Sequence, residues 1–465
     1  MKIFCIIILQ ISTYSSQLNT IISQYLGNSS AENTNVSISI RKISDEKEIF
    51  SYQPKMALPP ASTLKLLTTG TALDTLGEDF RFKTIVKTRG QINNGILDGN
   101  IIIVPNGDPS FGSKRLGLNS INEIVETLKL TKIKQINGRI LIEENRKYQI
   151  PNDWLLGDLG NYYGAFPKDF NYNENFYTVY FNGGDKVGDS VSIKKVSPSS
   201  VTWKIKNDVR TAEKGTGDQV NILNLAPYNE IVMSGTVPLK SSNFEVKGSI
   251  PNINNVFVDL LIAECSKNEI EVSNEVQTLD NPTDTLIILH SPKLSTIAEH
   301  CNFRSINFFA DGLSNFLVSN LSDSAQDYNI FLKNYWSKKG LNLNNFSFLD
   351  GSGLSPMNTF SPQTMTSFLS KMALSKSFDS FLASIPKVGK SGTVATLDPS
   401  GITRGRIYAK SGSISGTRNY AGYFFSEKND IYSFCIYLNG LNDAVQLLSR
   451  QFLQNLLFKM IDLNQ

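Results

Sequence analysis

Three short polar motifs, and the long intervals between them, constrain the fold of this chain more than any other feature. The motifs are Ser62-Thr63-Leu64-Lys65, Ser305-Ile306-Asn307 and Lys410-Ser411-Gly412. Ser62 and Ser305 are 243 residues apart, whereas Ser305 and Lys410 are 105 residues apart. If the three motifs meet in one site, the first interval leaves room for a large insertion between the first motif and the other two.

The pattern of apolar and polar residues changes within that interval. From about residue 80 to 284 the chain has short strand-like runs punctuated by Gly and Asn, for example at 101–104, 179–181 and 256–260. Only 120–130 shows a clear helical pattern there. At 465 residues the chain also exceeds the size of a single hydrophobic core. We therefore expect a β-rich insertion with its own packing.

The sequence on either side of the insertion predicts a mixture of helices and strands. Residues 36–41 and 48–52 alternate apolar and polar side chains around a charged turn, which is typical of a β-hairpin. A long apolar helix is expected from Ser62 to Leu76, with Gly77 as its stop signal. Further helices are predicted at 294–299, 308–318, 361–373 and 442–460, and strands at 405–410, 420–425 and 431–437.

The residue types in the three motifs point to nucleophilic catalysis. On a helix, Ser62 and Lys65 would project from one face. A serine hydroxyl needs a base, and a lysine serves as one only when burial or a nearby cation lowers its pKa. Lys410 would be that cation, while Ser305 can relay a proton and Asn307 can hold both Lys65 and a substrate carbonyl. Backbone N–H groups of Ser62 and of the strand after Lys410 would form an oxyanion hole.

Each motif alone is a common string, and local context separates the copies. Ser39 lies in a predicted strand, where i and i+3 point to opposite faces. Ser384 has a proline two residues later, and Lys390 lies in a stretch that reads as flexible. Only Ser62 opens a long apolar helix. Further copies begin at Ser44, Ser120 and Ser192.

Composition excludes other classes of function. The net charge of +3, without a block of like charges, argues against nucleic-acid binding. The chain has only two histidines, His290 and His300, so a histidine-based serine hydrolase is disfavoured. Its cysteines are scattered singly with no Cys-x-x-Cys pair. We expect no metal, no other cofactor and no disulfide framework.

The N-terminus resembles a secretory signal. Lys2 precedes an apolar run at 3–11 and small polar residues at 12–16. We expect a signal peptide at 1–16 and export to the periplasm, with a buried N-terminal helix as the alternative. The apolar run is too short to span a bilayer. The apolar stripe of the last helix is expected to pack on the sheet, so membrane association would be peripheral at most.

Further stretches strengthen the pattern and identify a family. They are Asn106-Gly-Asp-Pro-Ser110, the segment with Trp154, Asp158 and Tyr163-Gly164-Ala165, and Asp350-Gly-Ser-Gly-Leu-Ser355. With the three motifs, they resemble the class C low-molecular-weight penicillin-binding proteins, the D-alanyl-D-alanine carboxypeptidase/endopeptidase family. The resemblance runs from about residue 20 to the C-terminus.

This resemblance implies an α+β fold. It implies a β-lactamase/transpeptidase-like catalytic domain, an antiparallel sheet flanked by helices, built from residues 17–84 and 286–465. Residues 85–285 would form the β-rich insertion as two nested subdomains.

The resemblance also implies a reaction and its substrate. Ser62 would be acylated by the penultimate D-Ala carbonyl of a peptidoglycan stem peptide, and β-lactams would acylate the same serine. Catalysis would use Ser62, Lys65, Ser305, Asn307 and Lys410. Substrate binding would use Ser411 and Ser413 for the terminal carboxylate, with Gly412 between them, and Asp158 and Tyr163 for the diamino-acid side chain.

The sequence departs from the family pattern at three points. The third motif has Ser411 where threonine is usual, which keeps the hydroxyl, and Ile306 stands where aspartate is frequent. Pro356 replaces an arginine that some members carry, so the enzyme's preference for the side chain of the stem peptide stays open.

Two alternative functions also stay open, a β-lactamase or esterase on the same scaffold and a non-catalytic cell-wall-binding protein. The balance between carboxypeptidase and endopeptidase activity is not decided by the motifs.

Overall fold

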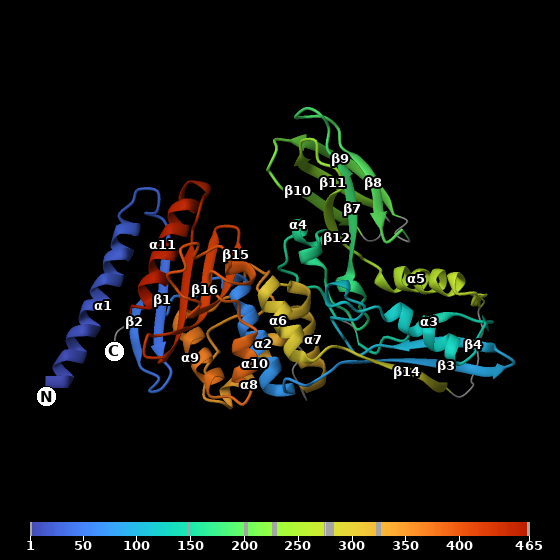
Figure 1. Cartoon of the computed structure of the whole chain (residues 1–465), viewed down its shortest axis with the longest axis horizontal. Helices are drawn as coiled ribbons and strands as arrows, with labels where there is room; N and C mark the ends of the chain where they lie inside the picture. The colour runs from blue at the N-terminus through green and yellow to red at the C-terminus, as the bar shows by residue number, and fades with distance from the viewer. Residues whose placement is uncertain are drawn as a thin grey trace. The chain divides into compact units, whose positions relative to one another are not determined.

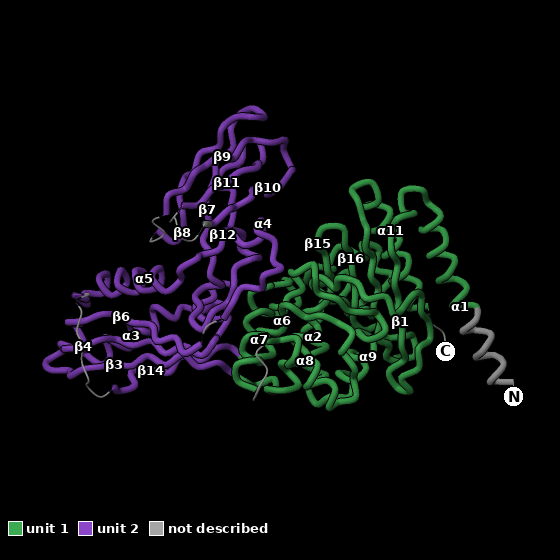
Figure 2. Tube along the Cα trace, turned by 180° about the vertical axis from the view of Figure 1, so that it is seen from behind, with its two compact units in different colours: residues 1–80, 293–465 green, residues 81–292 purple. Residues whose placement is uncertain are grey.

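The computed structural model describes residues 2–146, 148–199, 203–225, 230–273, 275, 283–321 and 327–462. The chain forms two compact units, one of Met1–Phe80 with Lys293–Gln465 and one of Arg81–Pro292 (Figure 2). All three motifs belong to the first unit. The domain limits expected from the sequence stay a prediction, because compactness alone does not establish which parts fold independently.

The first unit is built on a five-stranded antiparallel sheet in the order β15-β16-β17-β1-β2. Its first and last strands in the sequence, β1 and β17, pair along their whole length. The predicted hairpin and the three C-terminal strands are confirmed. The strands are β1 (Asn35–Lys42), β2 (Glu48–Tyr52), β15 (Ile407–Ile414), β16 (Thr417–Phe425) and β17 (Ile431–Asn439).

Helices α1 (Lys2–Leu26) and α11 (Gln446–Met460) pack together on one face of this sheet (Figure 1). Strand side chains such as Ile38 and Ile436 form one buried cluster with Leu18 of α1 and Phe452 of α11. Tyr25 stacks on Phe452 with ring centroids 4.2 Å apart. The predicted packing of the last helix on the sheet is confirmed.

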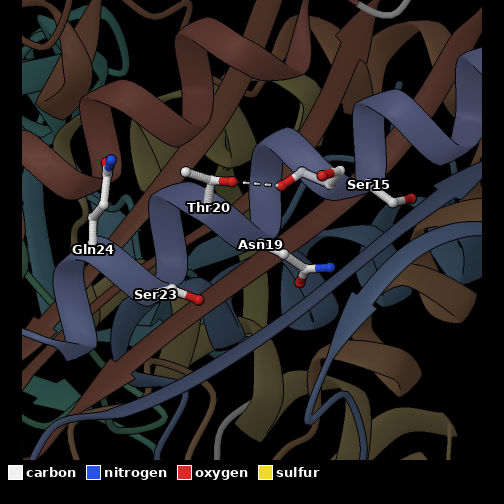
Figure 3. Close-up of a pocket in the computed structure, with 6 residues that line it drawn as sticks. Ser15, Asn19, Thr20, Ser23 and Gln24 are labelled. Atoms are coloured by element: carbon white, nitrogen blue, oxygen red, sulfur yellow. Dashed lines mark hydrogen bonds between the residues drawn. The ribbon is translucent and has the colours of Figure 1, made fainter.

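The outer face of α1 is polar. Figure 3 shows Ser15, Asn19, Thr20, Ser23 and Gln24 along this face, where Thr20 Oγ1 donates a hydrogen bond of 2.9 Å to the Ser16 carbonyl. Over the part of the chain that the structure describes, no helix has the length and apolar character needed to cross a membrane.

The opposite face of the sheet carries polar side chains that form hydrogen bonds with α9. Ser39 Oγ lies 2.9 Å from Thr366 Oγ1 of α9, and the Tyr423 hydroxyl donates to the Leu369 carbonyl at 2.7 Å. Behind α9 lies α2, which is buried on all sides from Leu64 to Leu73 and therefore needs helices around it. The predicted helices are present, as α2 (Leu64–Leu76), α6 (Leu294–Arg304), α7 (Asn307–Leu321) and α9 (Pro362–Ala373). Two helices that the sequence did not predict, α8 (Tyr328–Ser337) and α10 (Phe378–Ala383), also belong to this unit.

The second unit is β-rich, as predicted. One sheet runs β13-β5-β4-β3-β14 with β6 beside β4, and two three-stranded sheets run β10-β11-β9 and β12-β7-β8. Apolar side chains from all three sheets and from α3 and α5 form one buried cluster. The helices are α3 (Ser120–Leu130), α4 (Leu156–Leu159) and α5 (Ile253–Lys267). The strands are β3 (Lys83–Asn93), β4 (Ile96–Val104), β5 (Gln135–Ile136), β6 (Ile140–Ile142), β7 (Phe176–Asn182), β8 (Ser192–Ser197), β9 (Lys204–Ala212), β10 (Gln219–Leu225), β11 (Glu230–Pro238), β12 (Phe244–Ser249), β13 (Glu271–Val272) and β14 (Thr283–His290).

One predicted strand is wrong. Residues 256–260 lie inside α5. The Asn252 side chain accepts a hydrogen bond from the Asn255 N–H and so caps this helix. The buried residues Ile253, Phe257 and Leu261 recur every four positions, a helical period that a five-residue window does not reveal.

Candidate active site

Ser62 lies in a single 3₁₀ turn, η1 (Ala61–Thr63), that leads directly into α2. Its neighbour Ala61 has a φ of 47°, a left-handed conformation that is uncommon for a residue other than glycine. Lys65 follows in the first turn of α2, and its Nζ lies 2.9 Å from Ser62 Oγ. The structure thus places the two side chains together, as the spacing predicts.

Lys65 has three hydrogen-bond partners. Besides Ser62 Oγ, its Nζ donates to Asn307 Oδ1 and to the Ser352 carbonyl, both at 2.7 Å. The side chain is completely buried. Burial lowers the pKa of Lys65, while Cys301, Asp311 and Asp350 act in the opposite direction. The amine of Lys65 is therefore more easily deprotonated than the amine of an exposed lysine.

The Ser352 carbonyl is oriented by a tightly bonded loop. The Asp350 carboxylate accepts from the Gly353 and Ser355 N–H groups, both at 2.7 Å. Asp311 Oδ1 of α7 accepts from the Gly351 N–H at 2.9 Å. From the sequence, this loop was identified only by its resemblance to the family, and its contact with Lys65 was not predicted. A backbone acceptor leaves no residue-type signal, although the Asp-Gly-Ser-Gly string marks a turn.

Lys410 and Ser305 form a second pair, in which Lys410 is completely buried and Ser305 is partly buried. Lys410 Nζ, from β15, donates to Ser305 Oγ at 2.9 Å and to the Ser411 carbonyl at 2.7 Å. Ser305 ends α6 with a φ of 56°, and Asn307 begins α7 two residues later. Burial lowers the pKa of Lys410 well below its usual value, and the nearby charge of Lys65 lowers it further.

Gly412 lets β15 lie directly against the turn that carries Ser62. A Cβ at position 412 would stand 2.8 Å from the Pro60 carbonyl oxygen and 3.0 Å from the Ser62 nitrogen. Real Cβ atoms rarely come that close to backbone atoms. The glycine is thus required for the strand and the serine to approach each other.

The hydroxyls of Ser411 and Ser413 lie toward the C-terminal end of β15. Ser411 Oγ is 2.7 Å from Thr393 Oγ1, a residue that the sequence did not single out. Ser413 is exposed, and its Oγ donates to the Thr417 carbonyl at 3.2 Å.

Asp158 and Tyr163 lie in the second unit, in α4 and in η3 (Tyr162–Gly164). The structure pairs the two side chains in a hydrogen bond. Partial burial raises the pKa of Asp158, an effect that the bond from Tyr163 opposes. Burial, followed by the Asp158 charge, raises the pKa of Tyr163 to about 12. The phenol therefore stays protonated and donates to the carboxylate.

Metal ligands are not gathered anywhere among the described residues, since no three His, Cys, Asp or Glu side chains there are placed to hold an ion. Cys265, Cys301 and Cys435 are buried as free thiols.

This arrangement defines a class of enzyme. A serine hydroxyl bonded to a buried lysine, with a second lysine and a second serine beside it, is the machinery of a serine acyl-transferase that uses lysine as its base. The chain belongs to the D-Ala-D-Ala carboxypeptidase 3 (S13) family, whose model matches residues 18–459. It is accordingly a serine-type D-Ala-D-Ala carboxypeptidase of the penicillin-binding proteins, as the motifs indicated.

Curated relatives match nearly the whole chain. The D-alanyl-D-alanine carboxypeptidase DacB of Haemophilus influenzae is 24% identical over 422 residues, which cover 88% of this chain and 86% of the relative. A D-alanyl-D-alanine carboxypeptidase of Actinomadura sp. is 20% identical over 425 residues, covering 85% and 76%.

Solved structures show the same fold. The crystal structure of penicillin binding protein 4 from Haemophilus influenzae superposes with a TM-score of 0.78 at 23% identity, covering 96% of this chain and 99% of the other. A predatory peptidoglycan endopeptidase from Bdellovibrio bacteriovorus gives a TM-score of 0.54 at 18% identity, covering 92% and 94%. The predicted α+β fold, with its transpeptidase-like domain and β-rich insertion, is confirmed.

Proposed function

We propose that this chain hydrolyses the D-Ala-D-Ala termini of peptidoglycan stem peptides, their D-Ala crosslinks, or both, through an acyl-enzyme on Ser62. The observation that carries this proposal is the set of partners around Lys65. Asn307 Oδ1 and the Ser352 carbonyl can only accept hydrogen bonds. A neutral amine has two N–H groups, and these two acceptors occupy both. Its lone pair is then left for the one partner that can donate, the Ser62 hydroxyl.

The reaction follows from that geometry. Lys65 takes the proton of Ser62 Oγ as the oxygen attacks the penultimate D-Ala carbonyl carbon. The N–H of Ser62 and the edge of β15 beside Gly412 stabilise the negative charge that develops on the carbonyl oxygen. The C–N bond then breaks, and Ser305, bonded to Lys410, delivers a proton to the departing amino group. Water then attacks the ester: one of its protons passes to the Ser305–Lys410 pair, which gave one to the amine, and Lys65 returns its proton to Ser62 Oγ as the acid product leaves.

The terminal carboxylate of the substrate would bind at β15. In this proposal Ser411 and Ser413 bind the terminal carboxylate, supported by their place beyond Lys410 on the edge strand. The assignment of Asp158 and Tyr163, which belong to the second unit, to the diamino-acid side chain stays an expectation from the family resemblance.

Two of the similar solved structures support the proposal that β-lactams inhibit this enzyme covalently. Penicillin binding protein 4 from Haemophilus influenzae was crystallised with a β-lactam, and a Bdellovibrio bacteriovorus endopeptidase was crystallised in a form acylated by penicillin G. By the same chemistry, a β-lactam ring would open on Ser62 of this chain and form a stable ester.

We further propose that residues 1–16 direct export to the periplasm. Lys2 and the apolar run at 3–11 support this proposal. Cleavage after Ser16 would remove Tyr14 from the contact between α1 and the sheet and leave Leu18, Ile22 and Tyr25 in place. Mass measurement of the N-terminal peptide, after separation of periplasm from cytoplasm, tests both the cleavage and the location.

Purified muropeptides test the reaction itself. Incubation with a pentapeptide and with a crosslinked dimer, with products resolved by mass, should show release of D-Ala, cleavage of the crosslink or both. Release of neither product under conditions that serve a known DD-peptidase contradicts the proposal. Rapid hydrolysis of penicillin with intact muropeptides would instead identify a β-lactamase on this scaffold.

A further inference from the structure

The segment at 386–394 runs beside the edge strand of the sheet that carries Lys410. The Val388 N–H donates to the Ile407 carbonyl at 2.9 Å, and the Ala409 N–H donates to the Pro386 carbonyl at 2.8 Å. Within the segment, the Gly389 N–H donates a hydrogen bond of 3.1 Å to the Val394 carbonyl, so residues 389–394 form a turn. This stretch contains the second Lys-Ser-Gly string, at Lys390, whose glycines predict a flexible segment. It is instead hydrogen-bonded to β15.

Close packing sets the position of Thr393 within this segment. Gly392 has a φ of 59°, and a Cβ there would lie 2.8 Å from the Phe303 carbonyl oxygen and 2.9 Å from Pro386 Cβ. The short helix η6 (Gly392–Val394) is therefore wedged against the end of α6, two residues before Ser305. Thr393 is held between the two elements that carry the Ser305–Lys410 pair.

The Thr393 hydroxyl bonds to Ser411. The two Oγ atoms are 2.7 Å apart, and either can be the donor. Each hydroxyl has a single proton, so one bond between them consumes one proton and leaves one O–H to donate elsewhere. Lys410 Nζ donates to the carbonyl oxygen of the same Ser411 at 2.7 Å, so an amine that can carry charge is held against the residue that bears the hydroxyl. A free O–H donor in such surroundings is suited to an anion.

We propose that Thr393 is a positioning residue for the terminal carboxylate of the substrate. Its bond to Ser411 holds that hydroxyl in one of its staggered rotamers, so that the free O–H of the pair donates to the carboxylate. Without the Thr393 oxygen, Ser411 would have to be ordered when the substrate binds. The inference rests on the proposed function, because it assigns a role in binding the substrate's carboxylate.

Benzylpenicillin and its methyl ester separate this role from a structural one, since only the free acid offers a carboxylate. Acylation rates of both compounds are measured by stopped-flow or mass for wild type, Thr393→Val, Thr393→Ser and Thr396→Val. Thr396 is an exposed threonine three residues away and serves as the control. Thr393→Val should slow acylation by the free acid about 10-fold, the size of one charge-assisted hydrogen bond, and slow the ester less than 2-fold. Thr393→Ser and Thr396→Val should resemble wild type.

An equal loss for acid and ester in Thr393→Val, or no loss for either, overturns the proposal. If Thr393→Val does not fold, Thr393→Ala with the same pair of compounds takes its place. A wild-type protein that benzylpenicillin does not acylate at all would refute the proposed function itself, and that result differs from every outcome expected of the Thr393 variants.

Discussion

Lys65 Nζ lies 2.9 Å from Ser62 Oγ while it donates to Asn307 Oδ1 at 2.7 Å. The Asn307 amide thus holds the Lys65 amine within hydrogen-bond distance of the Ser62 hydroxyl. Because Lys65 is completely buried, its ammonium form is costly, and this cost makes the amine a usable base near neutral pH.

The pH dependence of acylation follows from that lowered pKa. Only neutral Lys65 can take the serine proton, so the acylation rate should fall as the pH drops through the pKa of Lys65 and level off above it. Asn307→Asp places a carboxylate against the amine, which favours the ammonium and raises the pKa of Lys65. We predict that the whole profile of rate against pH moves to higher pH in this variant. A pH series of benzylpenicillin acylation measures it, and a profile that stays in place or moves to lower pH contradicts the assignment.

Protein stability should also depend on pH through Lys410. Its pKa is well below the ordinary 10.5 in the folded protein, so the unfolded chain binds more protons between the two values. Stability gained from this group therefore increases as the pH rises toward 10.5 and is lowest below the folded pKa. Lys410→Met removes this dependence. The unfolding free energy of wild type minus that of Lys410→Met should increase between pH 7 and pH 9 in denaturant titrations; a constant difference would exclude the lowered pKa.

Much of the site was predictable because most of its catalytic residues belong to short sequence motifs. A helix repeats its faces every three to four residues, so Ser62 and Lys65 could be paired from their spacing alone. The pairing of β1 with β17 joins residues some 400 positions apart, and no local pattern specifies such a contact. The helical copy at Ser384 and the strand copy at Ser39 were set aside by context, and in the structure they end α10 and lie within β1.

Two contributors to the site were not predictable, for different physical reasons. The Ser352 carbonyl belongs to the backbone, which every residue has, so its contact with Lys65 depends on the loop's conformation. Thr393 reaches Ser411 through the packing of η6 against α6, a tertiary contact. The strand expected at 256–260 failed because its β-branched residues masked a longer helical period.

Gly412→Ala should damage catalysis by pushing β15 away from the serine turn. The added methyl group meets backbone atoms of Pro60, Ser62 and Thr63 at 3.0 Å or less, and backbone cannot move as a flexible side chain can. We expect an acylation rate at least 10-fold lower and a loss of about 1–3 kcal/mol in unfolding free energy. Gly157→Ala, where a Cβ meets nothing within 4 Å, is the control for kinetics and stability. An alanine at 412 with wild-type kinetics would show that the close approach is not needed.

Tyr25 should anchor α1 to the first unit. Its ring stacks on Phe452, and its hydroxyl lies 2.8 Å from Ser449 Oγ. Removing a buried aromatic side chain costs about 3 kcal/mol. Tyr25→Ala should therefore lower the thermal midpoint clearly, whereas Ser23→Ala, on the exposed polar face of α1 (Figure 3), should not. Equal midpoints for the two variants would mean that α1 does not stabilise the fold.

The central claim is that Ser62 carries the acyl group. Intact-protein mass measurement after incubation with benzylpenicillin tests it, with peptide mapping of the modified residue. We predict one added penicilloyl group on wild type, mapped to Ser62, and none on Ser62→Ala of equal thermal stability. An adduct on another residue, or one that persists in Ser62→Ala, would contradict the account.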